Sequence, residues 1–408
     1  MRLPETQAVI AALSAQGGEM RFVGGCVRDA MLPRAIKDVD IATHLPPDEV
    51  MVRLEEAGIR AIPTGIAHGT VTAVLGKAHY EITTLRRDVE TFGRHARIAF
   101  TNDWTADAAR RDFTINAMFA DAQGRVYDPF GGLADLAAGR VCFVGRAQTR
   151  IEEDVLRLLR FFRFHAHYGR PPMDAAALAA CRHMAPRLVD LSGERVAGEL
   201  LRLLDAPDPA SVLIVMKAEQ VLDYVLREAT AFGRLRMLTW LETRAMVRAT
   251  IRPDAMRRLA AVLETDRPDE VAERLKLSAA QSRRLEAMAK PVVAVTMDMD
   301  QRAARRALRR VGQDIFRDLV LVGWADHRSH TPRPAAAESA QWLALLDQAD
   351  SWEPVSLPVR GQDCLDLGVP HGPAIGAAMA ALEHWWEDHD YRPGRDECLG
   401  KLRELVGR

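Results

Sequence analysis

The sequence predicts an α+β fold, in which an N-terminal region with a small mixed sheet precedes an almost wholly helical remainder. Between residues 20 and 145, short runs of alternating or β-branched residues stand between turns, as strands do. From about residue 148 onward, apolar residues recur three and four positions apart, which is the period of helices packed on one face. A chain of 408 residues exceeds one ordinary core, so we expect about two to four domains.

The N-terminal region is expected to begin with strands that glycine or proline bounds at several ends. The expected strands cover residues 20–23, 39–42, 70–74, 78–84 and 125–127. Pro46 and Pro47 precede two acidic residues, a pattern that predicts a helix start and a helix over 50–57. The run DPFGG at residues 128–132 predicts a turn and a hinge.

The second region reads as a succession of amphipathic helices. They are expected over residues 150–168, 173–186, 193–205, 209–217, 233–249, 252–264, 267–290 and 335–350, with a final helical pair after residues 372–376. The run TPRP at 331–334 predicts a linker, because proline cannot continue a helix.

Composition restricts the class of protein. A hydrophobic content of 48% and a charged content of 27% are typical of a soluble globular chain, and no apolar run is long enough to span a membrane. The formal net charge of −1 means that any basic surface must be local. Five scattered cysteines without a C-x-x-C pair argue against disulfides and zinc, and they favour a reducing compartment. With no apolar core of a signal peptide at the N-terminus, we expect a cytoplasmic location.

Two carboxylates one residue apart, Asp38 and Asp40, point to metal chemistry. On an extended chain both side chains face the same way, and a divalent cation relieves their repulsion. Mg²⁺ takes carboxylate oxygens together with substrate phosphates. Upstream, Gly24 and Gly25 have no side chains to keep a triphosphate from backbone N–H groups. The pattern predicts nucleotidyl transfer, although a solvated strand end and a plain turn would also explain the residues.

Two further groups extend this prediction. Glu81 lies in the strand expected over 78–84, and it completes a three-carboxylate cluster if that strand neighbours Asp40; otherwise it is an exposed carboxylate. The run RRDFTINA at 110–117 combines arginines suited to triphosphate oxygens with groups that can bind ribose hydroxyls. It is also a plausible helix N-terminus with an acid in the first turn.

Asp154 and Arg157 are three residues apart and should share one face of the helix expected over 150–168. An ordinary helix ion pair is one interpretation. In the functional one, the carboxylate only accepts and the guanidinium only donates. The pair then matches a base edge with an amino donor beside a ring-nitrogen acceptor, as in cytosine and adenine. Uracil and guanine present the reverse pattern, so the pair would refuse them.

A weaker feature lies near residue 305. Five arginines at helical spacing share a broad face that suits RNA phosphates, or that is simply a solvated basic surface: Arg302, Arg305, Arg306, Arg309 and Arg310.

In this order, the motifs resemble those of the class II tRNA nucleotidyltransferases and the related bacterial poly(A) polymerases. The matching motifs, all between residue 20 and about residue 170, are GGxVRD, DxDIAT, HGTV, EITT, RRDFTINA, DPFGG and EDxLRxxR. Beyond about residue 205 the resemblance is looser. The family fold implies a nucleotidyltransferase-type α/β head with a small mixed sheet, followed by an all-helical neck, body and tail. The corresponding ranges here are 1–141, 142–205, 206–330 and 331–408.

The resemblance also implies roles for single residues. It implies metal ligation by Asp38 and Asp40, with Glu81 as the third catalytic carboxylate. For the nucleotide, it implies triphosphate contacts near Gly24, Gly25 and Arg28, ribose and phosphate contacts by Arg111, Asp112 and Asn116, and base recognition by Asp154 and Arg157 beside Arg160. The candidate RNA contacts Arg302, Arg306 and Arg309 rest on their helical spacing and not on the resemblance. Residues 86–103 fall where the family keeps a flexible loop.

The function expected from these features is Mg²⁺-dependent addition of CCA to tRNA 3′ ends from CTP and ATP, without a membrane partner. The RNA 3′-hydroxyl would attack the α-phosphate, and pyrophosphate would leave. The alternatives are A-only or CC-only addition, poly(A) synthesis, a small-molecule nucleotidyltransferase, and an RNA-binding protein with an inactive head. The long helical region disfavours the small-molecule enzyme, and the intact carboxylate pair disfavours the inactive protein.

Overall fold

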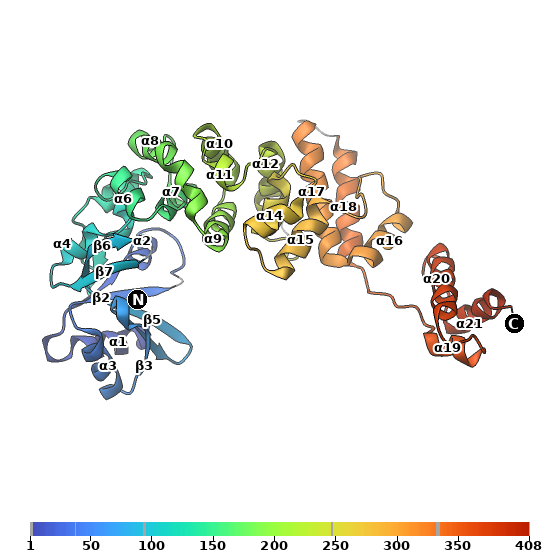
Figure 1. The fold of residues 1–408 in the computed structure, drawn as a ribbon, viewed down its shortest axis with the longest axis horizontal. Helices are drawn as coiled ribbons and strands as arrows, with labels where there is room; N and C mark the ends of the chain where they lie inside the picture. The colour runs from blue at the N-terminus through green and yellow to red at the C-terminus, as the bar shows by residue number, and fades with distance from the viewer. Residues whose placement is uncertain (1–2, 37, 93–94, 246–247, 332–334, 408) are drawn as a thin grey trace. The chain divides into compact units, whose positions relative to one another are not determined.

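The computed structural model describes residues 3–36, 38–92, 95–245, 248–331 and 335–407, with side chains outside 88–97. Its described part divides into two compact units. Unit 1 comprises residues 1–227 with 274–276, and unit 2 comprises residues 228–273 with 277–408. Figure 1 labels helices and strands of both units.

A mixed sheet forms the centre of unit 1. Within the described residues its strand order is β3-β4-β5-β2-β1-β8-β9. The strands are β1 (Met20–Val23), β2 (Val39–Thr43), β3 (Arg60–Gly65), β4 (Thr70–Leu75), β5 (Ala78–Thr84), β8 (Phe119–Ala120) and β9 (Val126–Tyr127). β2 pairs with β5 in parallel, and the other neighbouring pairs are antiparallel. The predicted α+β class with a small mixed sheet is confirmed.

Helices line this sheet and continue the unit. α1 and α3 pack on each other and on sheet strands, while α2 contacts β1 and β2. The helices are α1 (Pro4–Ser14), α2 (Gly25–Ala30), α3 (Pro47–Glu56), α4 (Trp104–Ala109), α5 (Gly132–Ala138), α6 (Ala147–Glu153), α7 (Leu156–Tyr168), α8 (Ala175–Met184), α9 (Gly193–Leu204), α10 (Pro209–Ala218) and α11 (Leu222–Val225). Short 3₁₀ turns cover Ala15–Gly17, Ile66–His68, Thr114–Asn116 and Ala185–Asp190.

Residues 86–103, expected to be a flexible loop, include a two-stranded antiparallel hairpin. It consists of β6 (Arg86–Phe92) and β7 (His95–Phe100), which pair with each other apart from the main sheet. Residues 93–94 lie outside the described part. The runs 86–92 and 95–100 were missed as strands because charged residues interrupt their alternation, which is the pattern that sequence prediction uses.

The regular elements of unit 2 in its described residues are helices, and an isolated antiparallel bridge joins Ala229 to Leu263. Its helices are α12 (Phe232–Trp240), α13 (Ala255–Val262), α14 (Pro268–Arg274, whose last residue groups with unit 1), α15 (Ala279–Ala289), α16 (Gln301–Val311), α17 (Gln313–His330), α18 (Ala336–Asp350), α19 (Gly361–Asp366), α20 (Pro373–Asp388) and α21 (Arg395–Leu405), and a π-helical turn covers Leu241–Ala245. α17 is central, because it packs against α12, α13, α15, α16 and α18.

Two hydrophobic clusters lie in unit 2. Phe316, Val320 and Trp324 of α17 share one cluster with Trp342 and Leu346 of α18. The other lies among α19, α20 and α21 and contains Cys364, Leu382, Trp386, Cys398 and Leu402. The boundary predicted at residue 331 therefore precedes a helix that completes the first cluster. Residues 332–334 of the predicted linker lie outside the described part of the chain; α17 ends at His330, and the cluster includes side chains of α18.

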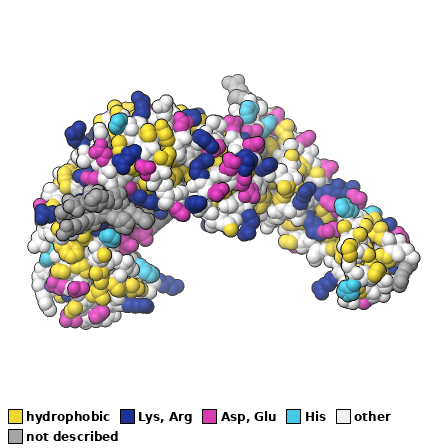
Figure 2. Space-filling view, in the orientation of Figure 1, with side chains coloured by type: hydrophobic (Ala, Val, Ile, Leu, Met, Phe, Trp, Pro, Cys, Tyr) yellow, Lys and Arg dark blue, Asp and Glu magenta, His cyan; other side chains and the backbone are white. Residues whose placement is uncertain are grey.

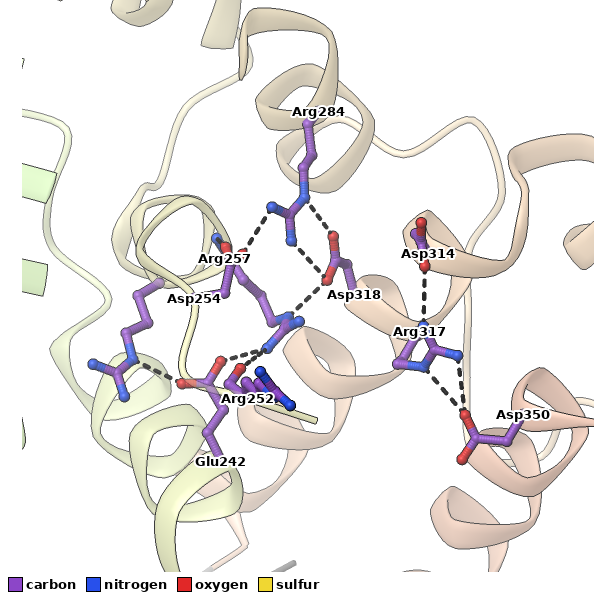
Figure 3. Close-up of polar contacts among 10 residues, drawn as sticks. Glu242, Arg252, Asp254, Arg257, Arg284, Asp314, Arg317, Asp318 and Asp350 are labelled. Atoms are coloured by element: carbon purple, nitrogen blue, oxygen red, sulfur yellow. Dashed lines mark hydrogen bonds and ion pairs between the residues drawn. The ribbon is translucent and has the colours of Figure 1, made fainter. Parts of the chain in front are cut away.

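Charged side chains are distributed differently on the surface and in the interior. Figure 2 shows basic and acidic side chains interspersed on the face in view, in keeping with the net charge of −1. In the interior of unit 2, Arg257 pairs with Glu242 at 2.6 Å and with Asp318 at 2.7 Å. Partly exposed Arg284 lies between Asp318 and Asp254 (Figure 3). In the described residues, none of the helices is both long enough and apolar enough to cross a bilayer.

Candidate active site

One cavity of about 1260 Å³ in unit 1 brings the predicted nucleotide and metal residues together. It is lined by every one of them: Gly24, Gly25, Arg28, Asp38, Asp40, Glu81, Arg111, Asp112, Asn116, Asp154, Arg157 and Arg160. These residues come from β2, β5, α2, α7 and the turns between them. Nine arginines and seven carboxylates line the cavity, so it is suited to a polyanion that also binds a cation.

The carboxylates gather at the β2–β5 pair. Asp40 lies directly opposite Glu81 in the parallel register, so the strands are neighbours, as the three-carboxylate hypothesis required. Burial raises the pKa of Asp40 to about 6, and the negative charges of Glu81 and Asp38 act in the same direction, while Arg111 opposes them. Negative charge is therefore concentrated here beyond what the surrounding protein neutralises.

This concentration of negative charge suits a divalent cation that is coordinated partly by the protein and partly by a substrate. Among the residues that the structure describes, no three His, Cys, Asp or Glu side chains form a group that could hold a metal ion. Mg²⁺, however, is usually bound by one or two carboxylates, substrate phosphates and water. Asp38 and Asp40 offer hard oxygen donors of this type beside the cavity.

The glycine pair lies where β1 meets α2. Gly24 has φ 70° and ψ −124°, a left-handed backbone that a side chain would strain. A Cβ atom on Gly24 would lie 3.5 Å from Nη1 of Arg111, and one on Gly25 would lie 3.6 Å from Nη2 of Arg28. Both guanidinium groups therefore lie next to the glycine pair at the edge of the cavity.

Arg111 is fixed on one side only. Its Nη2 donates to Oδ2 of Asp107 at 2.9 Å, and its guanidinium lies 5.5 Å from the ring of Phe119. Nε of Arg111 is buried without a hydrogen-bond partner in the described part of the chain. An anionic oxygen in the cavity would satisfy this donor.

The carboxylate of Asp112 accepts more hydrogen bonds from the protein than the sequence indicates. Its carboxylate accepts from the backbone N of Phe113, from Nδ2 of Asn116, and from Nε and Nη2 of Arg160, at 2.5–3.1 Å. Burial would raise the pKa of Asp112, but the Arg160 charge and these hydrogen bonds hold it below its usual range. The four donors fill the acceptor sites of a carboxylate, so Asp112 holds Asn116 and Arg160 in place.

The helix expected over 150–168 is interrupted at Asp154, and this corrects the predicted helical pair. Asp154 is the extended residue after α6, with φ −152° and ψ 108°, and its Oδ1 accepts from the backbone N of Leu156 at 3.2 Å. The side chain thus competes with the helix for a backbone donor. In place of a pair with Arg157, the carboxylate of Asp154 pairs with Nη2 of Arg195 at 2.8 Å.

Arg157 takes different partners. It pairs with Glu153, and its Nη2 donates to the carbonyl of Arg110 at 3.3 Å. Both Asp154 and Arg157 still line the cavity, one carrying acceptors and the other donors. The break in the helix places Asp154 in the connection before α7, where it is free of the regular helical spacing.

Several cavity residues were missed in the sequence analysis: Asp29, Arg34, Arg163, Tyr168, Arg195 and Arg202. Arg195 lies on α9, 41 residues from its partner Asp154, and Tyr168 lies 139 residues from Asp29. No local pattern links residues so far apart. Asp29 stands in the GGxVRD motif, and Arg163 and Tyr168 follow the EDxLRxxR motif; these positions were the sequence signals available for the three residues.

The arginine face of α16 lies in unit 2 and already has acidic partners there. Arg305 pairs with Asp390 at 2.6 Å, Arg306 pairs with Asp388 at 2.7 Å, and Arg309 pairs with Glu383. Arg302 donates to the carbonyl of Asp388. An RNA phosphate on this face would have to compete with these groups, so the RNA contact of Arg302, Arg306 and Arg309 stays a prediction.

Comparisons with known proteins agree with this geometry. Residues 20–142 match a family model described as the poly A polymerase head domain, and residues 172–232 match a model described as a probable RNA and SrmB-binding site of polymerase A. The CCA tRNA nucleotidyltransferase 1, mitochondrial, of Danio rerio is 34% identical over 396 residues, which cover 95% of this chain and 87% of that protein. A CCA-adding enzyme of Streptococcus pyogenes is 40% identical over 219 residues, 53% of each chain. A crystal structure of the Bacillus stearothermophilus CCA-adding enzyme in complex with CTP is similar over 99% of this chain and 98% of that one, with a TM-score of 0.79 and 26% identity.

Proposed function

The chain belongs to the family of the CCA tRNA nucleotidyltransferases, and from this we propose that it adds CCA to the 3′ end of tRNA, using CTP and ATP. The observation that carries the proposal is the cavity of about 1260 Å³ in unit 1. The carboxylates of β2 and β5, the two glycines and the polar groups around α7 all line this cavity. Such an arrangement can hold a triphosphate, a cation and a base at the same time.

The reaction joins the RNA 3′-oxygen to the α-phosphorus of the nucleotide. The bond between the α-phosphorus and the oxygen that bridges to the β-phosphate breaks, the hydroxyl proton is lost, and pyrophosphate leaves. When bound, Mg²⁺ would stabilise the attacking and leaving oxygens. Asp38 and Asp40 are the proposed ligands, and Glu81 supplies a third negative group opposite Asp40.

Binding of the triphosphate is assigned to basic groups at the glycine pair. Arg28 and Arg111 approach Gly25 and Gly24 and offer guanidinium donors, which suit phosphate oxygens. Asn116 lines the same space and is the proposed ribose contact. In this proposal Asp112 acts through Asn116 and Arg160, because its own acceptor sites are already filled.

Base recognition is assigned to Asp154 and Arg157. Asp154 would accept from the exocyclic amino group of cytosine or adenine, and Arg157 would donate to the ring nitrogen beside it. Asp154 pairs with Arg195, and its carboxylate oxygens can only accept hydrogen bonds. The O4 carbonyl of uracil would face the Asp154 carboxylate, and because both groups are acceptors they cannot form a hydrogen bond.

Asp154→Ala is expected to relax the choice of nucleotide. A bidentate base contact is worth about 1–3 kcal/mol of discrimination, so the ratio of kcat/KM for CTP over UTP should fall by roughly five- to two-hundredfold. Single-nucleotide incorporation into tRNA ending before its first C measures this ratio. Glu152→Ala is the matched control, since Glu152 is an exposed carboxylate two residues away that does not line the cavity. An unchanged ratio in Asp154→Ala would place base selection elsewhere.

The proposal retains four functional regions. The head (1–141) carries the metal and triphosphate groups, the neck (142–205) carries base recognition, and the body (206–330) and tail (331–408) would contact tRNA. Support for the first two comes from the cavity residues on each side of residue 142. A cytoplasmic location, supported by the scattered cysteines, completes the proposal and can be checked by cell fractionation.

One incubation tests the function and its nearest alternatives. tRNA lacking its 3′ CCA is given CTP, ATP or both with Mg²⁺, and the products are sequenced. CCA ends with both nucleotides, and CC ends with CTP alone, are expected. CC ends even with both nucleotides would indicate a CC-adding enzyme. Addition of A only to ends that already carry CC would indicate an A-adding enzyme, and long A tails would indicate poly(A) synthesis.

A further inference from the structure

Arg28, the proposed triphosphate contact, is held in place by contacts with three neighbouring side chains. Its Nε and Nη2 donate to the two carboxylate oxygens of Asp29 at 2.9 and 3.0 Å. Its Nη1 donates to Oδ1 of Asn116 at 2.5 Å, and its guanidinium lies 4.1 Å from the ring centre of Tyr168. The side chain is 8% exposed, so its position is set by these neighbours.

Tyr168 contacts this arrangement twice. Its ring stacks on Arg28, and its hydroxyl donates to Oδ1 of Asp29 at 3.0 Å, the oxygen that also accepts from Nε of Arg28. Tyr168 is the last residue of α7. The same helix carries Arg160 two turns earlier, where it pairs with Asp112.

The contacts form a closed ring. From Tyr168 it runs through Asp29 to Arg28, from there to Asn116 and Asp112, and back to α7 at Arg160. Because both ends are on one helix, α7 fixes the glycine-side helix α2 and the turn with Asn116 relative to itself. The ring thus connects the proposed triphosphate contact with the helix that carries Arg157.

We infer that Tyr168 is a positioning residue for the triphosphate of the incoming nucleotide, acting through Arg28. The inference rests on the proposed function, since it assigns Arg28 to the triphosphate. The triphosphate is common to CTP and ATP, so Tyr168 acts on both nucleotides equally. The choice of base is assigned to Asp154 and Arg157 and does not depend on Tyr168.

Two substitutions separate the two contacts of Tyr168. Tyr168→Phe keeps the ring over Arg28 and removes the hydroxyl, so we expect KM for CTP and for ATP to rise about two- to tenfold. Tyr168→Leu removes the ring as well, and we expect a rise of about tenfold or more. In both variants kcat should change less than KM, and the kcat/KM ratio of CTP over UTP should stay at the wild-type value.

Titration calorimetry with CTP and with inorganic pyrophosphate makes the result independent of incorporation. We expect Kd for both ligands to rise in step with KM, because both present phosphate oxygens to Arg28. A wild-type protein that adds no nucleotide would overturn the proposed function, while the Kd change in the Tyr168 variants decides the inference. If Tyr168→Leu does not fold, Tyr168→Phe alone decides it.

A double-mutant cycle shows whether Tyr168 acts through Arg28. In an Arg28→Ala background, Tyr168→Leu should leave Kd for pyrophosphate unchanged, because the group that it positions is gone. The matched control is Tyr224→Leu, at an exposed tyrosine of unit 1 that does not line the cavity, and it should leave both Kd values as in wild type. The inference is wrong if the Tyr168 variants bind pyrophosphate like wild type. It is also wrong if the Tyr168→Leu effect persists without Arg28.

Discussion

Replacing Asp40 with alanine is expected to abolish the incorporation of both C and A while tRNA binding stays near the wild-type level. Asp40 lies opposite Glu81 and beside Asp38, where burial and like charges raise its pKa to about 6. In the proposed mechanism it is a metal ligand, and metal stabilisation of the transition state is worth several kcal/mol. We therefore expect kcat to fall about a thousandfold or more, since each 1.4 kcal/mol corresponds to a factor of ten.

The measurement for Asp40→Ala combines single-turnover incorporation with calorimetric titration of tRNA. Asp38→Ala should behave in the same way, because both carboxylates are proposed ligands. Asp190→Ala is the matched control in the same unit, since Asp190 is exposed and lies outside the cavity lining. Near-normal turnover in Asp38→Ala or Asp40→Ala would exclude their role as metal ligands, whereas loss of tRNA binding alone would assign them to the RNA.

The strand positions of the head could be predicted because they depend on local patterns. The predicted strand over 78–84 is β5, and the ones over 20–23 and 39–42 match β1 and β2 within one residue. β3, at 60–65, was missed because Pro63 and the exposed positions around it do not alternate as a half-buried strand does. β2 pairs with β5 although the two segments are about 40 residues apart. The sequence could not predict this pairing, so the three-carboxylate cluster was predicted only on the condition that the strands are neighbours.

Hydrophobic periodicity did not predict the break in the helix at Asp154. Apolar residues continue at helical spacing on both sides, so the pattern favours one helix. What decides the matter is one carboxylate that accepts from the backbone N of Leu156 and meets Arg195 from α9. Asp is a helix-capping residue, and this was the available local signal. The Arg195 contact depends on how α7 and α9 pack, which no short pattern contains.

Unit 2 contains a buried network of charges whose role is structural. Arg257 and Arg258 share Glu242. Asp318 pairs with Arg257 and Arg284 (Figure 3). The four residues Glu242, Arg257, Arg258 and Asp318 are each at most 5% exposed. Replacing a whole buried network with apolar residues can be neutral, but removing one partner leaves an uncompensated charge.

Arg257→Met is therefore expected to lower the free energy of unfolding by about 3–5 kcal/mol, as measured by urea denaturation at pH 7.5. Methionine retains the hydrophobic stem and removes the charge that Glu242 and Asp318 both contact. Arg267→Met is the control in the same unit. Arg267 is exposed and pairs with Asp269, so its loss should leave the free energy of unfolding close to the wild-type value.

The effect of Arg257→Met should also depend on pH, and the sign follows from Glu242. Burial raises the pKa of Glu242 in the native protein, and Arg257 and Arg258 offset this only in part. Without Arg257 that pKa rises further, so native Glu242 binds a proton more strongly than it does in the unfolded chain. Stability of the variant should then fall as pH rises from the unfolded pKa to the native one. We expect a smaller loss at pH 5 than at pH 7.5, and an equal loss would show that packing, and not charge, makes Arg257 necessary.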